Sequence, residues 1–87
     1  MDRNEYIKLA QYACIKFAIY GHDAERAEWK DSELVSYGGV KYIPIAYVLT
    51  FDSTGNPVHN VKIRDVKANS EIETSLDKIH KLEEQIK

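Results

Sequence analysis

The sequence predicts an α+β fold with two layers, in which helices at both ends of the chain pack on one face of an antiparallel three-stranded meander. Apolar residues recur every three or four positions near both termini, as in amphipathic helices. Between them, apolar and polar residues alternate, and turn-forming residues separate the runs, as in β-hairpins. With 87 residues, the chain has room for one core. We therefore expect one small domain over residues 1–87.

The first helix is predicted over residues 3–20. Asp2 and Glu5 have the spacing of a capping box, and Gly21 suits the left-handed position that ends many helices. Its predicted buried face contains Tyr6, Ala10, Ala13, Phe17 and Tyr20, widened by Ile7, Cys14 and Ala18. Because free cysteines are usually buried, we expect Cys14 in the core and not as a nucleophile.

Residues 22–33 show the least regular pattern in the chain. They are compatible with a surface connector and with a short helix, and the sequence does not decide between them. A lone tryptophan usually packs against a core. We therefore expect Trp29 to fold back onto the rest of the domain.

The β region begins with a predicted hairpin, in which Leu34–Tyr37 and Val40–Ile43 flank the dipeptide Gly38-Gly39. Two glycines between such runs are typical of a two-residue turn. The second strand continues to Phe51. Pro44 interrupts this strand, and because proline lacks an N–H donor we expect a bend or bulge there.

A second hairpin is predicted around the turn-forming residues 52–57. The expected pairs are Phe51 with His59, Leu49 with Val61 and Tyr47 with Ile63. In this register the buried face contains Ile43, Ile45, Tyr47, Leu49, Val61 and Ile63, and the opposite face carries Ala46, Val48, Thr50, Asn60, Lys62 and Arg64.

The C-terminal part is predicted to end in a helix over residues 75–86. Thr74 and Asp77 have capping-box spacing. Four apolar residues then fall within about a third of a helical wheel: Leu76, Ile79, Leu82 and Ile86. For residues 66–74, a loop and a fourth strand both remain open.

Composition and motifs favour a non-enzymatic protein without a cofactor. The chain has 12 basic and 14 acidic residues, a formal net charge of −2, which indicates no particular partner. We find no phosphate-binding loop, no paired catalytic carboxylates and no nucleophile beside a base. His22, His59 and His80 lack the spacing of metal ligands, so no metal site is expected.

The predicted location is the cytoplasm, without membrane association. A lone cysteine forms no intrachain disulfide, which suits a reducing compartment. The apolar segment 9–20 is interrupted by Gln11 and Lys16 and does not follow a basic stretch, so it reads as a helix and not as a signal peptide. No run reaches the roughly 18 apolar residues that a membrane span needs.

The function expected from these features is that of a small accessory or interaction protein, a type common in bacteria and their mobile elements. Helices on one face of the sheet would leave the other face open. Its small apolar and basic residues suit a binding surface for another protein or for a second copy of the chain, as a homodimer. The candidate interaction surface is Tyr42, Ala46, Val48, Thr50, Lys62 and Arg64.

Nucleic-acid binding is the alternative, because Lys62, Arg64 and Lys67 form a basic cluster. The predicted order of helix, three-stranded meander and helix is similar to that of double-stranded-RNA-binding domains. The similarity implies a duplex RNA partner. Such domains contact duplex RNA through phosphates and 2′-hydroxyls and use basic residues at the start of the last helix. Here only Lys78 and Lys81 stand there, beside several acidic residues, so protein association is preferred.

Overall fold

The computed structural model describes residues 1–21, 28–68 and 70–82, and it confirms an α+β fold with an antiparallel sheet. One helix, α1 (Arg3–Tyr20), precedes five strands and two single 3₁₀ turns. The strands are β1 (Val35–Tyr37), β2 (Val40–Phe51), β3 (Pro57–Asp65), β4 (Glu71–Ser75) and β5 (His80–Lys81), and the turns are η2 (Asp31–Glu33) and η3 (Leu76–Lys78).

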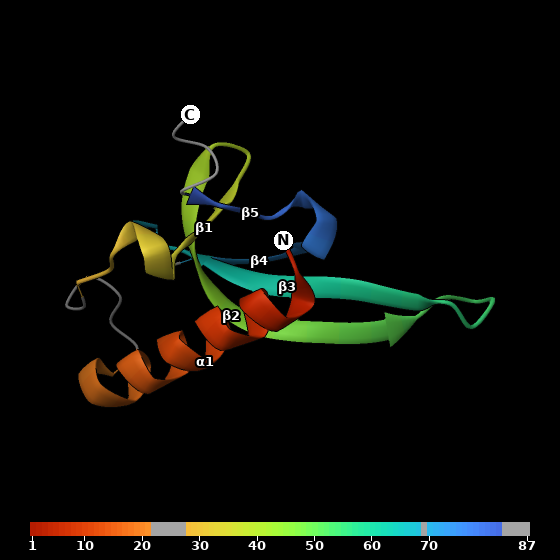
Figure 1. Cartoon of the computed structure of the whole chain (residues 1–87), viewed down its shortest axis with the longest axis horizontal. Helices are drawn as coiled ribbons and strands as arrows, with labels where there is room; N and C mark the ends of the chain where they lie inside the picture. Colours follow the sequence, from red (N-terminus) through yellow and green to blue (C-terminus); the bar gives the residue numbers. More distant parts are fainter. Residues whose placement is uncertain (22–27, 69, 83–87) are drawn as a thin grey trace.

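The sheet has the strand order β4-β3-β2-β1-β5 and is strongly curled. Only η3 and Ile79 separate the end of β4 from the start of β5, although these strands lie at opposite edges. A flat sheet would hold its edges about 19 Å apart, whereas this connection spans only about 13 Å. The sheet therefore curls until both edge strands approach η3 (Figure 1).

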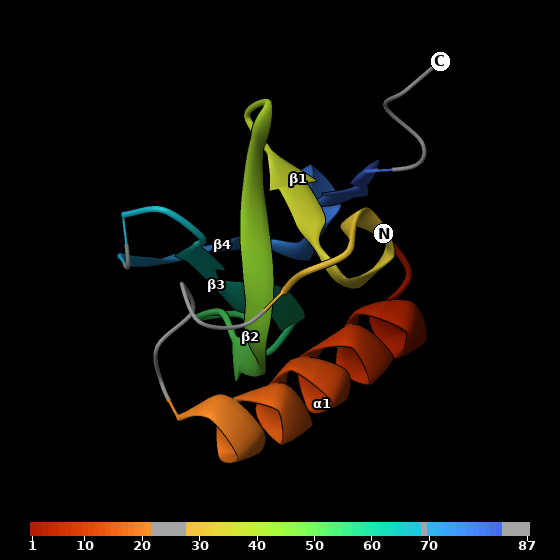
Figure 2. The ribbon, with the colours of Figure 1, turned by 90° about the vertical axis from the view of Figure 1, so that its left-hand side faces the viewer.

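The core consists of two clusters that α1 joins. Tyr6 belongs to the first cluster and Ala13 to the second. Figures 1 and 2 show α1 crossing the bend of β2. The buried members of the first cluster are Tyr6, Val35, Val61, Ile63, Leu76 and Ile79, and those of the second are Ala13, Leu34, Ile43 and Leu82. Trp29 packs against the second cluster, which confirms its predicted place.

The bulge predicted at Pro44 is present. The register between β2 and β3 shifts between Pro44 and Ala46, so that Ile45 is the extra residue. An extra residue reverses the alternation of faces along a strand. Ile43 consequently lies opposite Arg64 and in a different cluster from Ile63. The prediction that Ile43 and Ile63 line one buried face is therefore wrong.

Beyond the bulge, the predicted register is wrong by two residues. Phe51 pairs with Pro57 and not with His59, and Tyr47 pairs with Val61. A shift of two residues keeps every side chain on its expected face. The shorter loop is favoured because the turn satisfies its own hydrogen bonds, including that from the Asp52 N–H to the Asn56 carbonyl (2.9 Å).

The predicted helix over residues 75–86 is wrong for residues 75–81, and residues 83–86 lie outside the described residues. Residues 71–75 form β4, so a strand follows the turn after β3, and η3 and β5 come next. Leu76, Ile79 and Leu82 are nevertheless buried, as the pattern required. A spacing of three residues suits a 3₁₀ turn followed by a short strand as well as a helix. Among residues 1–21, 28–68 and 70–81, the sheet consequently has five strands, not three or four, and one helix, α1, packs on it.

The helix α1 has the predicted bounds, but its ends and faces differ in detail. Asp2 makes no side-chain cap, and Glu5 instead pairs with Lys81 (2.8 Å). Cys14 is exposed, so its predicted core position is wrong. The sheet contacts a narrower stripe of the helix than the apolar pattern suggests. The predicted glycine turn is confirmed, because Gly38 and Gly39 have φ of 58° and 79°.

Candidate interaction surface

The hairpin of β2 and β3 extends beyond the rest of the sheet. β4 pairs with β3 only as far as Asn60, and β1 pairs with β2 only from Val40 to Tyr42. Residues 49–59 therefore form a two-stranded projection, here called the β2–β3 arm (Figure 1). An isolated two-stranded hairpin is marginally stable in water. The β2–β3 arm thus depends on its turn and its base.

The turn at the tip is organised around the carboxylate of Asp52. Its Oδ1 accepts hydrogen bonds from the Thr54 N–H (2.9 Å), the Thr54 hydroxyl (2.7 Å) and the Asn56 N–H (2.9 Å). Gly55 adopts a φ of 83°, which glycine tolerates best. The Thr54 hydroxyl, and next the Asn56 N–H, lower the pKa of the Asp52 carboxyl, because they stabilise its charged form.

The base of the β2–β3 arm is held by two tyrosines. The buried Tyr6 hydroxyl contacts the carbonyls of Lys62 (2.7 Å) and Ala46 (3.1 Å), which pair directly after the bulge. Burial raises the pKa of Tyr6, so this hydroxyl stays protonated and can donate. Tyr47 contacts His59 Nδ1 through its hydroxyl. These contacts connect both strands of the hairpin to each other and to α1.

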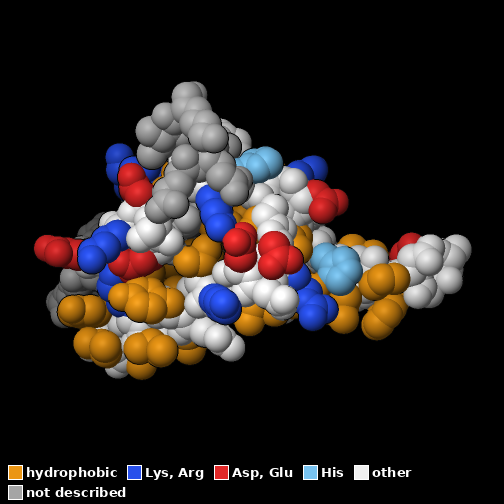
Figure 3. Space-filling view, viewed as in Figure 1, with side chains coloured by type: hydrophobic (Ala, Val, Ile, Leu, Met, Phe, Trp, Pro, Cys, Tyr) orange, Lys and Arg blue, Asp and Glu red, His pale blue; other side chains and the backbone are white. Residues whose placement is uncertain are grey.

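The apolar side chains of the β2–β3 arm are exposed. Leu49 is 45% and Phe51 is 66% exposed, although the sequence pattern predicts both in the core. They alternate along β2 and therefore share one face. Figure 3 shows apolar side chains along the projecting hairpin. Their proximity to the turn was the one sequence signal that they lie far from the core.

The structure brings together part of the predicted interaction surface. Ala46 pairs with Lys62, and Val48 and Thr50, two and four residues further along β2, lie on the same face. Ala46 and Val48 are partly buried, while Thr50 and Lys62 are exposed. The other two predicted residues lie on the far side of the bulge. Tyr42 packs against the first core cluster, and Arg64 lies opposite Ile43.

Each residue of the basic cluster has a carboxylate beside it. In the register of β3 and β4, Lys62 stands opposite Glu73 and Arg64 stands opposite Glu71. Lys67 donates its backbone N–H to Asp65 Oδ1 (2.8 Å), and the pKa of Asp65 is lowered by the Ala68 and Lys67 N–H groups. These carboxylates weaken the local positive potential that phosphate binding needs. In the order predicted from the sequence the last helix follows the third strand of the meander, whereas here β4, η3 and β5 follow β3.

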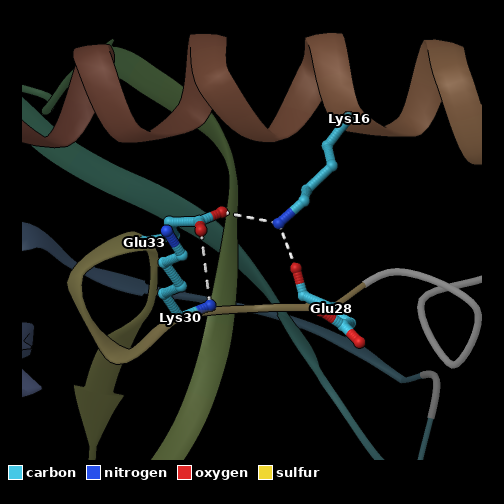
Figure 4. A network of polar contacts seen from close by, with 4 residues as sticks. All are labelled: Lys16, Glu28, Lys30 and Glu33. Atoms are coloured by element: carbon cyan, nitrogen blue, oxygen red, sulfur yellow. Dashed lines mark hydrogen bonds and ion pairs between the residues drawn. The ribbon is translucent and has the colours of Figure 1, made fainter.

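A second polar network ties residues 28–33 to α1 (Figure 4). Lys16 Nζ binds Glu33 Oε2 (2.8 Å), contacts the Glu28 carbonyl and lies 4.7 Å from the centre of the Trp29 ring. Glu33 Oε1 also accepts from the Lys30 N–H (3.3 Å). Both oxygens of the buried Glu33 carboxylate are thus hydrogen-bonded. The network therefore holds residues 28–33 against α1, which is a structural role.

Within residues 1–21, 28–68 and 70–82, no three His, Cys, Asp or Glu side chains gather where they could hold a metal ion. The same residues include no helix that is both long and apolar enough to cross a membrane. Comparison of the chain with family models, with curated proteins and with solved structures finds no match in any of the three sets.

Proposed function

We propose that this protein acts without catalysis, by associating with a second copy of itself through the β2–β3 arm. The observation that carries the proposal is the long edge of β2. From Tyr47 to Phe51 this strand has β3 on one side and, among the described strands, no partner on the other. The proposal keeps the cytoplasm as the expected location, because the free Cys14 thiol is exposed and such thiols persist in reducing compartments.

An unpaired strand edge favours association because it presents backbone N–H and C=O groups to a second strand. Two identical edges pair antiparallel about a two-fold axis, so that each copy gives and receives the same contacts. The pairing adds to each β2–β3 arm the further strand that hairpins need for stability. Partner binding would therefore stabilise the least supported part of the sheet.

The side chains of the β2–β3 arm suit such an interface. Leu49 and Phe51 provide exposed apolar area on one face. Thr50 and Lys62 provide a polar border on the other, next to the partly buried Val48. An apolar centre with a polar rim is the usual arrangement of protein interfaces.

The test is sedimentation velocity of the full chain over a wide concentration range, with Phe51→Ser and Val48→Glu as variants. We expect the wild type to dimerise and both variants to remain monomeric with an unchanged far-UV spectrum. The matched control is Ile19→Ser, which removes a side chain that is 70% exposed on α1, far from the β2–β3 arm. This control should dimerise like the wild type.

Three results would contradict the proposal. A wild type that stays monomeric at every concentration removes self-association. Loss of dimers in Ile19→Ser with retention in Phe51→Ser moves the interface to α1. A monomeric chain that binds duplex RNA with an affinity falling steeply with salt would instead support the nucleic-acid alternative.

A further inference from the structure

A groove separates the C-terminal half of α1 from the bulge of β2. Its volume is about 360 Å³. Phe17, Pro44 and Ile45 form its apolar wall, and Arg64 and Glu71 are its charged residues. Pockets for small ligands have volumes of about 300 to 1,000 Å³ and are mostly apolar with a few polar groups. The groove is therefore of a suitable size and composition for a small ligand.

The Nε of Arg64 is the one buried side-chain nitrogen or oxygen without a hydrogen bond among the described residues. The guanidinium of Arg64 lies over the ring of Phe17, with 5.8 Å between the guanidinium carbon and the ring centre. Buried charged groups are normally paired, because losing hydration without compensation is costly. A half-buried guanidinium that lines an apolar groove, with one N–H left without an acceptor, is a feature that a bound anion would explain.

We propose that this groove binds a small apolar molecule that carries a carboxylate. The carboxylate pairs with the planar guanidinium of Arg64, whose fork of N–H donors matches two carboxylate oxygens. The hydrocarbon part lies against Phe17, Pro44 and Ile45. None of these residues belongs to the β2–β3 arm, so this proposal stands independently of self-association.

Glu71 opposes the bound anion. It lies across from Arg64 in the β3–β4 register and also lines the groove, yet no ion pair joins the two side chains within the described residues. A carboxylate ligand and Glu71 would repel each other at short range. Neutralising Glu71 should therefore tighten ligand binding, whereas neutralising Arg64 should weaken it.

The test is an NMR titration of the ¹⁵N-labelled full chain with hexanoate, matched by hexanol and hexylammonium. We expect hexanoate to shift the amide signals of Phe17, Ile45 and Arg64 and to bind at least about tenfold tighter than hexanol. Arg64→Met should weaken hexanoate binding at least about tenfold, and Glu71→Gln should tighten it several-fold. Arg64→Lys is a second variant, which keeps the charge and loses the fork and so tests the proposal even where Arg64→Met does not fold; it should bind with intermediate affinity.

The proposal is overturned if hexanol and hexanoate bind equally, if hexanoate shifts no signals at the groove, or if Arg64→Met and Arg64→Lys both retain wild-type affinity. It is also overturned if Glu71→Gln destabilises the protein and leaves hexanoate binding unchanged, because Arg64 would then pair with Glu71 in solution. Saturation of the groove by hexanoate with no change in sedimentation would leave the self-association proposal untouched.

Discussion

The strands β2 and β3 run through the body of the sheet and through the β2–β3 arm. The two regions share the same alternation of apolar residues but differ in the elements that pack against them. In the body of the sheet, Val61 and Ile63 are fully buried. In the β2–β3 arm, Leu49 and Phe51 alternate in the same way, yet they are 45% and 66% exposed. The body has β1, β4 and α1 around it, and the β2–β3 arm has none of them. Alternation thus assigns a side chain to a face, while neighbouring elements decide whether that face is buried.

The largest expected effect is a difference in stability loss between two alanine substitutions, one in the body of the sheet and one in the β2–β3 arm. Ile63→Ala should lower the free energy of unfolding by about 2 to 5 kcal/mol, because it leaves a cavity in the first core cluster. Leu49→Ala should lower it by less than about 1 kcal/mol. Chemical denaturation at low protein concentration measures both. Equal losses there would mean that Leu49 is covered within a single copy.

A smaller effect is expected from the hydroxyl that connects α1 to the base of the β2–β3 arm. Tyr6→Phe keeps the ring and leaves the Ala46 and Lys62 carbonyls without this donor. We expect a loss of about 1 to 3 kcal/mol in the free energy of unfolding, the usual cost of an unsatisfied buried group. Tyr12→Phe is the matched control, because Tyr12 is half exposed, and it should change stability by less than about 0.5 kcal/mol. An unchanged free energy of unfolding in Tyr6→Phe would show that water takes the place of the hydroxyl.

The smallest effect concerns pH and should be confined to the β2–β3 arm. The pKa of Asp52 is lowered in the folded chain by the Thr54 hydroxyl and the Asn56 N–H. A lowered folded-state pKa means that the contribution is present above the unfolded pKa of about 4 and is lost as the pH falls through the lower, folded value. Amide signals of Thr54 and Asn56 should therefore shift together as the pH falls below about 4, and Asp52→Asn should abolish this transition. Signals that stay constant throughout the acid range would show that Asp52 does not organise the turn.

Several elements were predictable because they depend on neighbours in sequence. The bounds of α1, the Gly38-Gly39 turn and the bulge at Pro44 follow from helical periodicity, from the positive φ of glycine and from the missing N–H of proline. The helix predicted at residues 75–86 was wrong for residues 75–81, because apolar residues three positions apart suit a 3₁₀ turn and a short strand as well as a helix. The pattern still identified Leu76 and Ile79 as buried.

The candidate interaction surface was predictable only in part. Alternation placed Ala46, Val48 and Thr50 on one face, and they do lie beside Lys62 there. The exposure of Leu49 and Phe51 was not predictable, because it depends on where β1 and β4 end. The separation of Tyr42 from this surface depends on the parity change at the bulge of β2, whereas Arg64 keeps the parity of Lys62 on β3 and lies beyond the bulge, beside Phe17.

The sequence by itself determined the turns, the bounds of α1 and the faces of the strands beyond the bulge, since these depend on backbone preferences and hydrogen bonds over a few residues. Only the tertiary structure decided the curl of the sheet, the length of the projecting hairpin and the burial of the Arg64 Nε. These depend on contacts between distant segments, such as the bond from Tyr6 to Lys62 across 56 positions of sequence. A local pattern carries no information about which distant segment arrives to cover it, because that choice is made by the packing of the whole chain.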